Sequence, residues 1–149
     1  MKYLTLLLLL GLSVPAFAQS DEQPQPNAEG VYENVEQMPL YRADCPGDYD
    51  EAKPCADRAM LEYVYENLTY PAKAKENEVE GMVVVSFIVE RDGTITNPTI
   101  YRDIGSGAGE EVLRLVRAMN DNGPAWRPGM QDGKPVRVEF KLPVKFSLG

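Results

Sequence analysis

The chain has 149 residues, the size of one ordinary domain, and 44% of them are hydrophobic. Its formal net charge of −8 argues against nucleic-acid binding and against docking on an anionic membrane, because both require a basic surface. The chain contains no His and only two Cys, which argues against His-based catalysis, a conventional zinc site and an iron–sulfur cluster. We therefore expect neither a metal nor a cofactor.

The N-terminus has the layout of a secretory signal peptide. Lys2 precedes an apolar stretch at 4–14, and the Ala-Phe-Ala that ends at Ala18 presents the small residues of a cleavage site. The alternative is an uncleaved membrane anchor, but this apolar stretch is shorter than the roughly 20 residues that span a bilayer. We expect cleavage after Ala18, so that residues 1–18 are removed and the mature protein is exported.

The acidity of the chain belongs to the residues before position 67. Residues 19–66 hold twelve acidic and three basic side chains, whereas 67–149 hold eleven of each. Residues 19–30 are polar and contain Pro, so we expect a disordered lead, followed by an acidic extension at 31–66. The extension contains the only two Cys, and export into an oxidising compartment predicts a Cys45–Cys55 disulfide. The carboxylates around them do not match an EF-hand loop, and we interpret them as a solvated acidic loop.

Hydrophobic periodicity predicts the next elements in chain order. A short strand is expected within 31–41, and a helix capped by Asp57 is expected to run to about residue 68. A second, short helix begins at Pro71 and ends before Gly81.

A hairpin and a third helix follow. Residues 82–90 are rich in β-branched and aromatic side chains, and Asp92-Gly93 leads into a return strand at 94–102 with a bulge near Thr96-Asn97. The glycines at 105–109 open a helix with an apolar stripe. They lack the Gly-Lys-Ser/Thr of a phosphate-binding loop, so we interpret them as turn and cap residues.

The closing strand at 136–146 alternates apolar and polar side chains, as a half-buried strand does. Pro143 cannot donate a ladder hydrogen bond, and Lys141 and Lys145 flank it, which is typical of a sheet edge. We expect Trp126, the lone Trp, to be buried. The pattern predicts a small α+β domain in which helices pack on a three-stranded antiparallel sheet, with a disulfide-closed segment and its helix in front.

Four motifs follow one another at domain spacing: YPAKA at 70–74, EGMVVVSF at 80–87 running into Asp92-Gly93, EVLRLV at 111–116 with WRPG at 126–129, and LPVKF at 142–146. Together they resemble the C-terminal domain of the TonB family, in the version found in Bacteroidetes-type bacteria. That domain is the periplasmic end of the energy transducer for outer-membrane receptors. The resemblance implies a periplasmic TonB-like domain at 67–149.

The resemblance also implies a binding function, in which the TonB box of an outer-membrane receptor is added to the sheet as an extra strand. The TonB box is expected to bind along the closing strand, with the segment 67–71 beside it. A full TonB protein also has an anchor that engages proton-motor proteins of the inner membrane and a long Pro-rich spacer. The motor proteins are expected as partners only if the N-terminus stays uncleaved. A long Pro-rich spacer does not follow the N-terminal apolar stretch in this sequence. The partner-binding residues implied are Asn67, Thr69, Tyr70, Pro71, Glu139, Phe140, Lys141, Leu142, Pro143, Val144 and Lys145.

Three alternatives remain open at the level of sequence. In the first alternative, the edge of the closing strand pairs with a second copy of the chain in a homodimer. In the second, the acidic extension docks another periplasmic protein as a scaffold. The third alternative is an enzyme, which we do not expect: Glu110 and Glu111 are adjacent and diverge on a helix, and Ser86 and Ser106 have no His to activate them.

Overall fold

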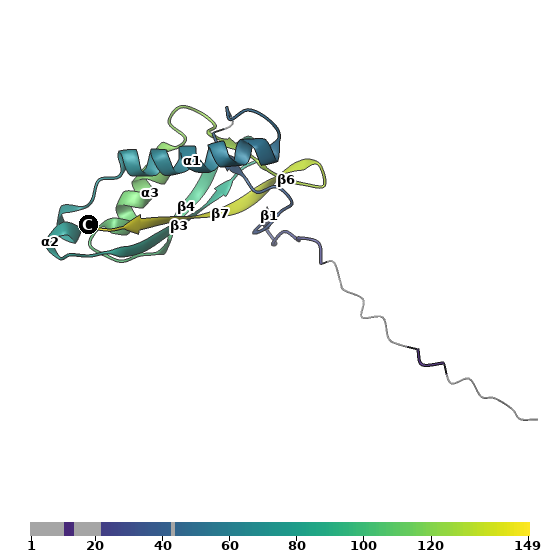
Figure 1. Ribbon diagram of the computed structural model, residues 1–149, viewed down its shortest axis with the longest axis horizontal. Coiled ribbons are helices and arrows are strands. Elements are labelled where there is room, and N and C mark those ends of the chain that lie inside the picture. The colour runs from purple at the N-terminus through teal and green to yellow at the C-terminus, as the bar shows by residue number, and fades with distance from the viewer. Residues whose placement is uncertain (1–10, 14–21, 43) are drawn as a thin grey trace, which may run out of the picture.

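The computed structural model describes residues 11–13, 22–42 and 44–149 (Figure 1). The predicted signal peptide and its cleavage position after Ala18 lie outside the described residues, apart from 11–13. Within these ranges, none of the helices combines the length and the hydrophobicity that a bilayer span requires.

Three long antiparallel strands form the centre of the fold. β3 (Gly81–Val89) lies between β4 (Ile95–Arg102) and β7 (Lys134–Phe146). The predicted bulge is present, because the β3–β4 register shifts between Ser86 and Ile88, where Asn97 has a positive φ of 51°. The predicted α+β class is thus confirmed.

Short strands enlarge this sheet. β1 (Val31–Tyr32) pairs parallel with the start of β7, and β6 (Gly129–Gln131) forms a hairpin with it. β2 (Leu40–Tyr41) and β5 (Trp126–Arg127) form a separate antiparallel pair. The single strand expected within 31–41 is therefore two short strands that join different partners.

The helices are α1 (Tyr49–Asn67), α2 (Ala72–Glu76) and α3 (Ala108–Ala118). α1 begins eight residues before the expected cap at Asp57, so that expectation was wrong. The actual cap is Asp48, whose carboxylate accepts the backbone N–H of Glu51 at 3.0 Å. Asp57 instead lies within the helix and forms an ion pair with Lys53.

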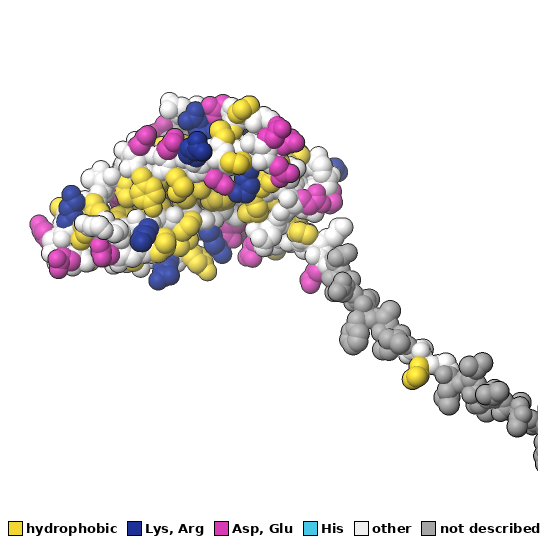
Figure 2. Space-filling model, viewed as in Figure 1, with side chains coloured by type: hydrophobic (Ala, Val, Ile, Leu, Met, Phe, Trp, Pro, Cys, Tyr) yellow, Lys and Arg dark blue, Asp and Glu magenta, His cyan; other side chains and the backbone are white. Residues whose placement is uncertain are grey.

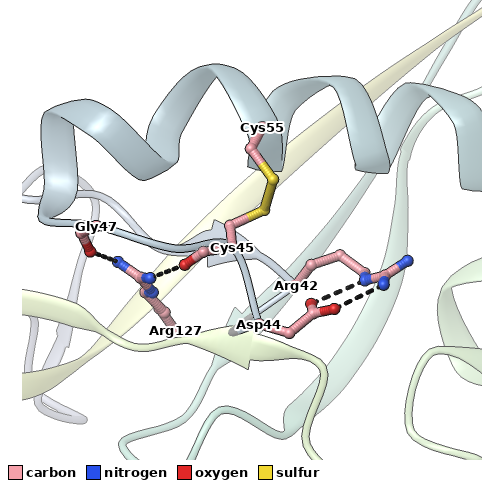
Figure 3. The surroundings of a disulfide bond; sticks show 6 residues. All are labelled: Arg42, Asp44, Cys45, Gly47, Cys55 and Arg127. Atoms are coloured by element: carbon pink, nitrogen blue, oxygen red, sulfur yellow. Dashed lines mark hydrogen bonds and ion pairs between the residues drawn. A yellow bond between two sulfur atoms is a disulfide. The ribbon is translucent and has the colours of Figure 1, made fainter.

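The predicted disulfide is confirmed, and it ties the first turns of α1 to the strand pair beneath them (Figure 3). Cys45 lies in the loop after β2 and Cys55 on α1. The guanidinium of Arg127, on β5, donates hydrogen bonds to the carbonyl oxygens of Cys45 and Gly47. The loop is therefore fixed from two sides.

Trp126 anchors the core, as expected. It is 2% exposed, and its ring centroid lies 5.4 Å from Tyr41, 5.5 Å from Phe87 and 5.0 Å from Phe140. The apolar stripe of α3 and Val64 of α1 pack into the same core as the inward-facing side chains of the sheet. The helices thus cover one face of the sheet.

Candidate functional site

The most distinctive surface of the fold is the outer edge of β7. β3 pairs with β7 from Val138 to Phe146, whereas on the opposite side β1 reaches only Val138. Among the described residues, no strand pairs with that side from Glu139 onward. α1 runs along this edge in Figure 1, and the Tyr65 hydroxyl accepts the backbone N–H of Lys145 at 3.3 Å.

Two hydrogen bonds show which backbone groups of β7 face the open side. Lys145 donates its N–H to Tyr65 and therefore away from β3. Glu90 donates its N–H to Thr94, on the β4 side, so even-numbered residues of β3 bond β4 and odd-numbered ones bond β7. Odd-numbered residues of β3 lie opposite even-numbered residues of β7, so the even-numbered residues of β7 bond β3. Because consecutive residues of a strand direct their backbone groups to opposite sides, the odd-numbered residues of β7 direct both backbone groups outward.

The outward backbone positions are thus Glu139, Lys141, Pro143 and Lys145. Pro143 lacks an N–H, but it stands at a position where the β3 ladder requires none. This explains how a Pro fits into a strand that is otherwise paired along its whole inner side. The prediction from Pro143 that the closing strand is a sheet edge therefore holds for the part of β7 from Glu139 onward. The part before Glu139 instead pairs with β6 and β1.

Side chains along the edge divide between two faces. Lys141, Pro143 and Lys145 are exposed on the uncovered face of the sheet, where the ammonium of Lys141 lies 4.5 Å from the ring centroid of Tyr101. Leu142 and Val144 point into the core and are buried.

Apolar side chains also gather beside the edge. Figure 2 shows a band of them between α1 and β7. Leu61 and Tyr65 of α1 are 53% and 50% exposed. Next to Glu139–Lys141, a pocket of about 300 Å³ is lined also by Glu33, Asn34 and Met38. Sequence reasoning missed these α1 and β1–β2 residues, because their place beside β7 depends on tertiary packing.

The segment 67–71 contacts the C-terminal end of β7 through Tyr70. The ring of Tyr70 packs edge-on against Phe146, with centroids 5.3 Å apart. The other members contact α3: the Asn67 carbonyl accepts from Arg114, the Thr69 N–H donates to Glu111 at 2.9 Å, and Pro71 lies against Gly107. The contact of Tyr70 with β7 is thus at Phe146, one residue beyond the implied stretch Glu139–Lys145.

The glycine-rich turn before α3 is filled by its own carboxylate. Asp103 Oδ1 accepts the backbone N–H groups of Ile104, Gly105 and Gly109 at 2.8–3.0 Å. A Cβ at Gly109 would lie 2.6 Å from the Asp103 carboxyl carbon, which is too close for any side chain. The glycines therefore serve the turn, and no space remains for a phosphate at these amides.

A partly buried ion pair fixes the end of the open edge. Arg137 Nε lies 2.8 Å from Glu90 Oε2, and its Nη1 donates to the Glu29 carbonyl at 2.9 Å. The hydrogen bond from Arg137 holds the pKa of Glu90 below its ordinary value, although burial opposes this. The pair thus holds the residues before β1 against β7 and limits the open stretch to residues after Val138.

This ion pair predicts a pH-dependent loss of stability. Glu90→Gln should lower the free energy of unfolding by about 1–2 kcal/mol at pH 7, since it removes a charge-assisted hydrogen bond. Because the pKa of Glu90 is depressed in the folded state, the native pair contributes fully above the ordinary glutamate pKa. Its contribution is lost as pH falls through the lower folded value. Urea unfolding at pH values from 7 to 3 should show that the free energies of unfolding of the native protein and of the Glu90→Gln variant converge as the pH falls. Glu110→Gln, at an exposed position of α3, is the control; a difference that persists at pH 3 would contradict the assignment.

A comparison with known protein families identifies the family of this chain. A family model described as the Gram-negative bacterial TonB protein C-terminal matches residues 66–148, more than half of the chain. The chain therefore belongs to this family, and the resemblance seen in its four motifs is confirmed. The family is linked in general to TonB-dependent transport, and its C-terminal domains are periplasmic interaction modules.

Two solved structures are similar to this chain. Both are NMR solution structures of the Helicobacter pylori TonB C-terminal domain. One is 22% identical, with a TM-score of 0.45, and the match covers 60% of this chain and 77% of that one. The other is 20% identical, with a TM-score of 0.44, and the match covers 60% of this chain and 90% of that one. No curated protein matches the chain.

Proposed function

We propose that this protein docks an extended segment of an outer-membrane TonB-dependent receptor, the TonB box, as an added strand along residues 139–145 of β7. The observation that carries the proposal is the row of backbone groups on β7 that no strand pairs among the described residues. Glu139 and Lys141 offer both N–H and C=O to such a strand, and Pro143 offers its C=O. The stretch is about 20 Å long, which suits a segment of six or seven residues.

Side chains beside the edge would give this docking its selectivity. Every second side chain of an added strand faces the side of the sheet that α1 covers, where Leu61, Tyr65 and the half-buried Phe140 present apolar surface. The alternate side chains face Lys141 and Lys145 on the uncovered side. Exposed ion pairs contribute only about 0–1 kcal/mol each, so main-chain pairing should supply most of the affinity.

Two substitutions at one position test the main-chain contribution. Lys141→Pro removes an outward N–H but no hydrogen bond to β3, and should weaken binding of a synthetic receptor segment by about tenfold or more, since at least one strand hydrogen bond is lost. Lys141→Ala removes the same charge and the contact with Tyr101 but keeps the N–H, so it should change the affinity by no more than about threefold. Isothermal titration calorimetry measures both.

Chemical-shift mapping provides the second readout and needs no variant. When the isotope-labelled protein is titrated with the receptor segment, amide shifts should concentrate in 139–146 and around Thr69-Tyr70. Circular dichroism of both variants checks that the fold is kept. Equal affinities of the two Lys141 variants, or shifts confined to residues 44–57, would overturn edge docking; the second outcome would favour a scaffold role for the acidic extension.

A further inference from the structure

A small pocket lies at the point where β1 leaves the edge of β7. β1 pairs with β7 as far as Tyr32 and Val138 and ends there. The pocket of about 300 Å³ beside Glu139–Lys141 is lined on its other side by the residues that follow β1. Its volume is at the lower end of the range for ligand sites, so it suits one long side chain better than a whole small molecule.

The wall between β1 and β2 is held in place by β6. Gln37 exchanges two backbone hydrogen bonds with Met130, at 2.8 and 3.1 Å. The side chain of Gln131 is 5% exposed; it accepts the backbone N–H of Glu36 at 3.0 Å and donates to the Glu36 carboxylate at 3.3 Å. Because a buried amide is satisfied by this segment, moving the wall would leave that amide unpaired. The pocket is therefore formed before any partner binds.

The pocket carries negative charge. Glu33 and Glu139 both line it, and neither forms an ion pair among the described residues. The β1 register, continued by one residue past Tyr32, brings Glu33 next to Glu139. Lys141 also lines the pocket, but its ammonium lies over the Tyr101 ring on β4, with β3 in between. Two neighbouring carboxylates repel each other, so the pocket favours a cationic group.

An added strand along 139–145 reaches this pocket with one of its ends. The strand and β1 share one edge of β7, so the strand occupies the edge from the point where β1 stops. Its residue opposite Glu139 directs its side chain to the same face as the Glu139 carboxylate, with Cβ atoms about 5 Å apart. A Lys or Arg at this position places its charge between the two carboxylates, while the half-buried Met38 and Phe140 contact its apolar stem.

We propose that this pocket selects receptor segments that carry a Lys or Arg at the end of the added strand next to Glu139. The inference rests on the proposed function, because the pocket acts on a strand that is already paired with β7. Glu33, Asn34 and Met38 lie outside 66–148, the part of the chain that matches the family model. The selectivity is therefore a contribution of the acidic extension and not of the family domain alone.

Matched peptides measure the selectivity. A synthetic receptor segment of about seven residues is capped at both ends to remove its terminal charges. One pair of peptides carries norleucine or Lys at the first position, and a second pair carries them at the last position. Isothermal titration calorimetry with the native protein should show that Lys binds about fivefold more tightly than norleucine in one pair and no more than about twofold in the other. The pair that responds reports the direction of the added strand.

A protein variant assigns the preference to the pocket. Glu33→Gln keeps the size of the side chain and removes its charge, so the preference for Lys should fall to about twofold or less. Affinity for the norleucine segment should stay within about twofold of the native value, because no strand hydrogen bond changes. Glu110→Gln changes the net charge equally at an exposed position of α3 and should keep the fivefold preference. Together these measurements form a double-mutant cycle, which isolates the pairwise interaction.

The outcomes separate this inference from edge docking. Equal affinities for Lys and norleucine at both ends, or a Glu33→Gln variant that keeps the full preference, overturn the selectivity pocket. Edge docking stands in both cases if the norleucine segments bind and shift the amides of 139–146. Failure of every segment to bind overturns edge docking, and the selectivity pocket with it.

Discussion

Trp126→Ala should lower the free energy of unfolding by about 3–5 kcal/mol, the largest loss we expect from any single truncation in this chain. The indole is 2% exposed and contacts three aromatic rings that come from β2, β3 and β7. Its backbone N–H also donates to the carbonyl of Gly93, in the β3–β4 turn, at 3.2 Å. Truncation thus leaves a cavity where four parts of the chain meet.

Two further variants separate packing from polar effects. The buried indole nitrogen of Trp126 has no hydrogen-bond partner among the described protein atoms, so Trp126→Phe loses volume but no hydrogen bond. We expect it to cost about 1–2 kcal/mol. Tyr101→Ala, at a side chain that is 64% exposed, should cost less than about 1 kcal/mol. Urea unfolding must be followed by circular dichroism, because Trp126 is the lone Trp. A cost below about 1 kcal/mol for Trp126→Ala, together with impaired binding of the receptor segment, would assign the side chain to binding instead.

Removal of the disulfide should have the next largest effect. Replacing both Cys45 and Cys55 by Ala should lower stability by roughly 2–3 kcal/mol, because the bond closes a loop of about ten residues in the unfolded chain. Ala preserves the apolar character of the cluster in which Cys45 is buried with Leu40 and Ala52. Denaturant unfolding of the oxidised protein and of this variant measures the difference.

The m-value, the dependence of the free energy of unfolding on denaturant concentration, indicates whether the loss of stability arises in the unfolded state. An unfolded chain without the cross-link exposes more surface, so the m-value of the variant should rise. Arg127→Lys is the structural control, since it weakens the bonds to Cys45 and Gly47 while the cross-link remains. Equal stability of the oxidised protein and the Cys-free variant would show that α1 is held by packing alone.

Local patterns in the sequence were sufficient to predict the centre of the fold. The Asp92-Gly93 turn, the β-branched run before it and the strict alternation of 136–146 each depend on near neighbours. The start of α1 was missed because Pro54 favours a break and Asp57 is a good cap by residue type. In the structure Pro54 lies inside the helix, and a cap earlier in the chain, Asp48, begins it.

The sequence predicted only part of the candidate site. Pro143 and its flanking Lys residues pointed to an edge, but the direction of each N–H required knowing which strand lies on the inner side. The positions of Tyr65 and Met38 beside β7 depend on packing between segments far apart in the chain, which no local pattern encodes. The resemblance implied a role for Asn67 and Thr69, yet their contacts are with α3.

The pairing order of the sheet has a consequence for when the chain can fold. β7 is synthesised after the other described strands, and it pairs with β3 and with β1, where Val31 lies opposite Arg137. A nascent chain can form the β3–β4 hairpin early, but the core stays open until β7 is complete. A chain that is released or cleaved before residue 134 therefore exposes the inner faces of β3 and α3, which makes residues 134–146 a requirement for solubility.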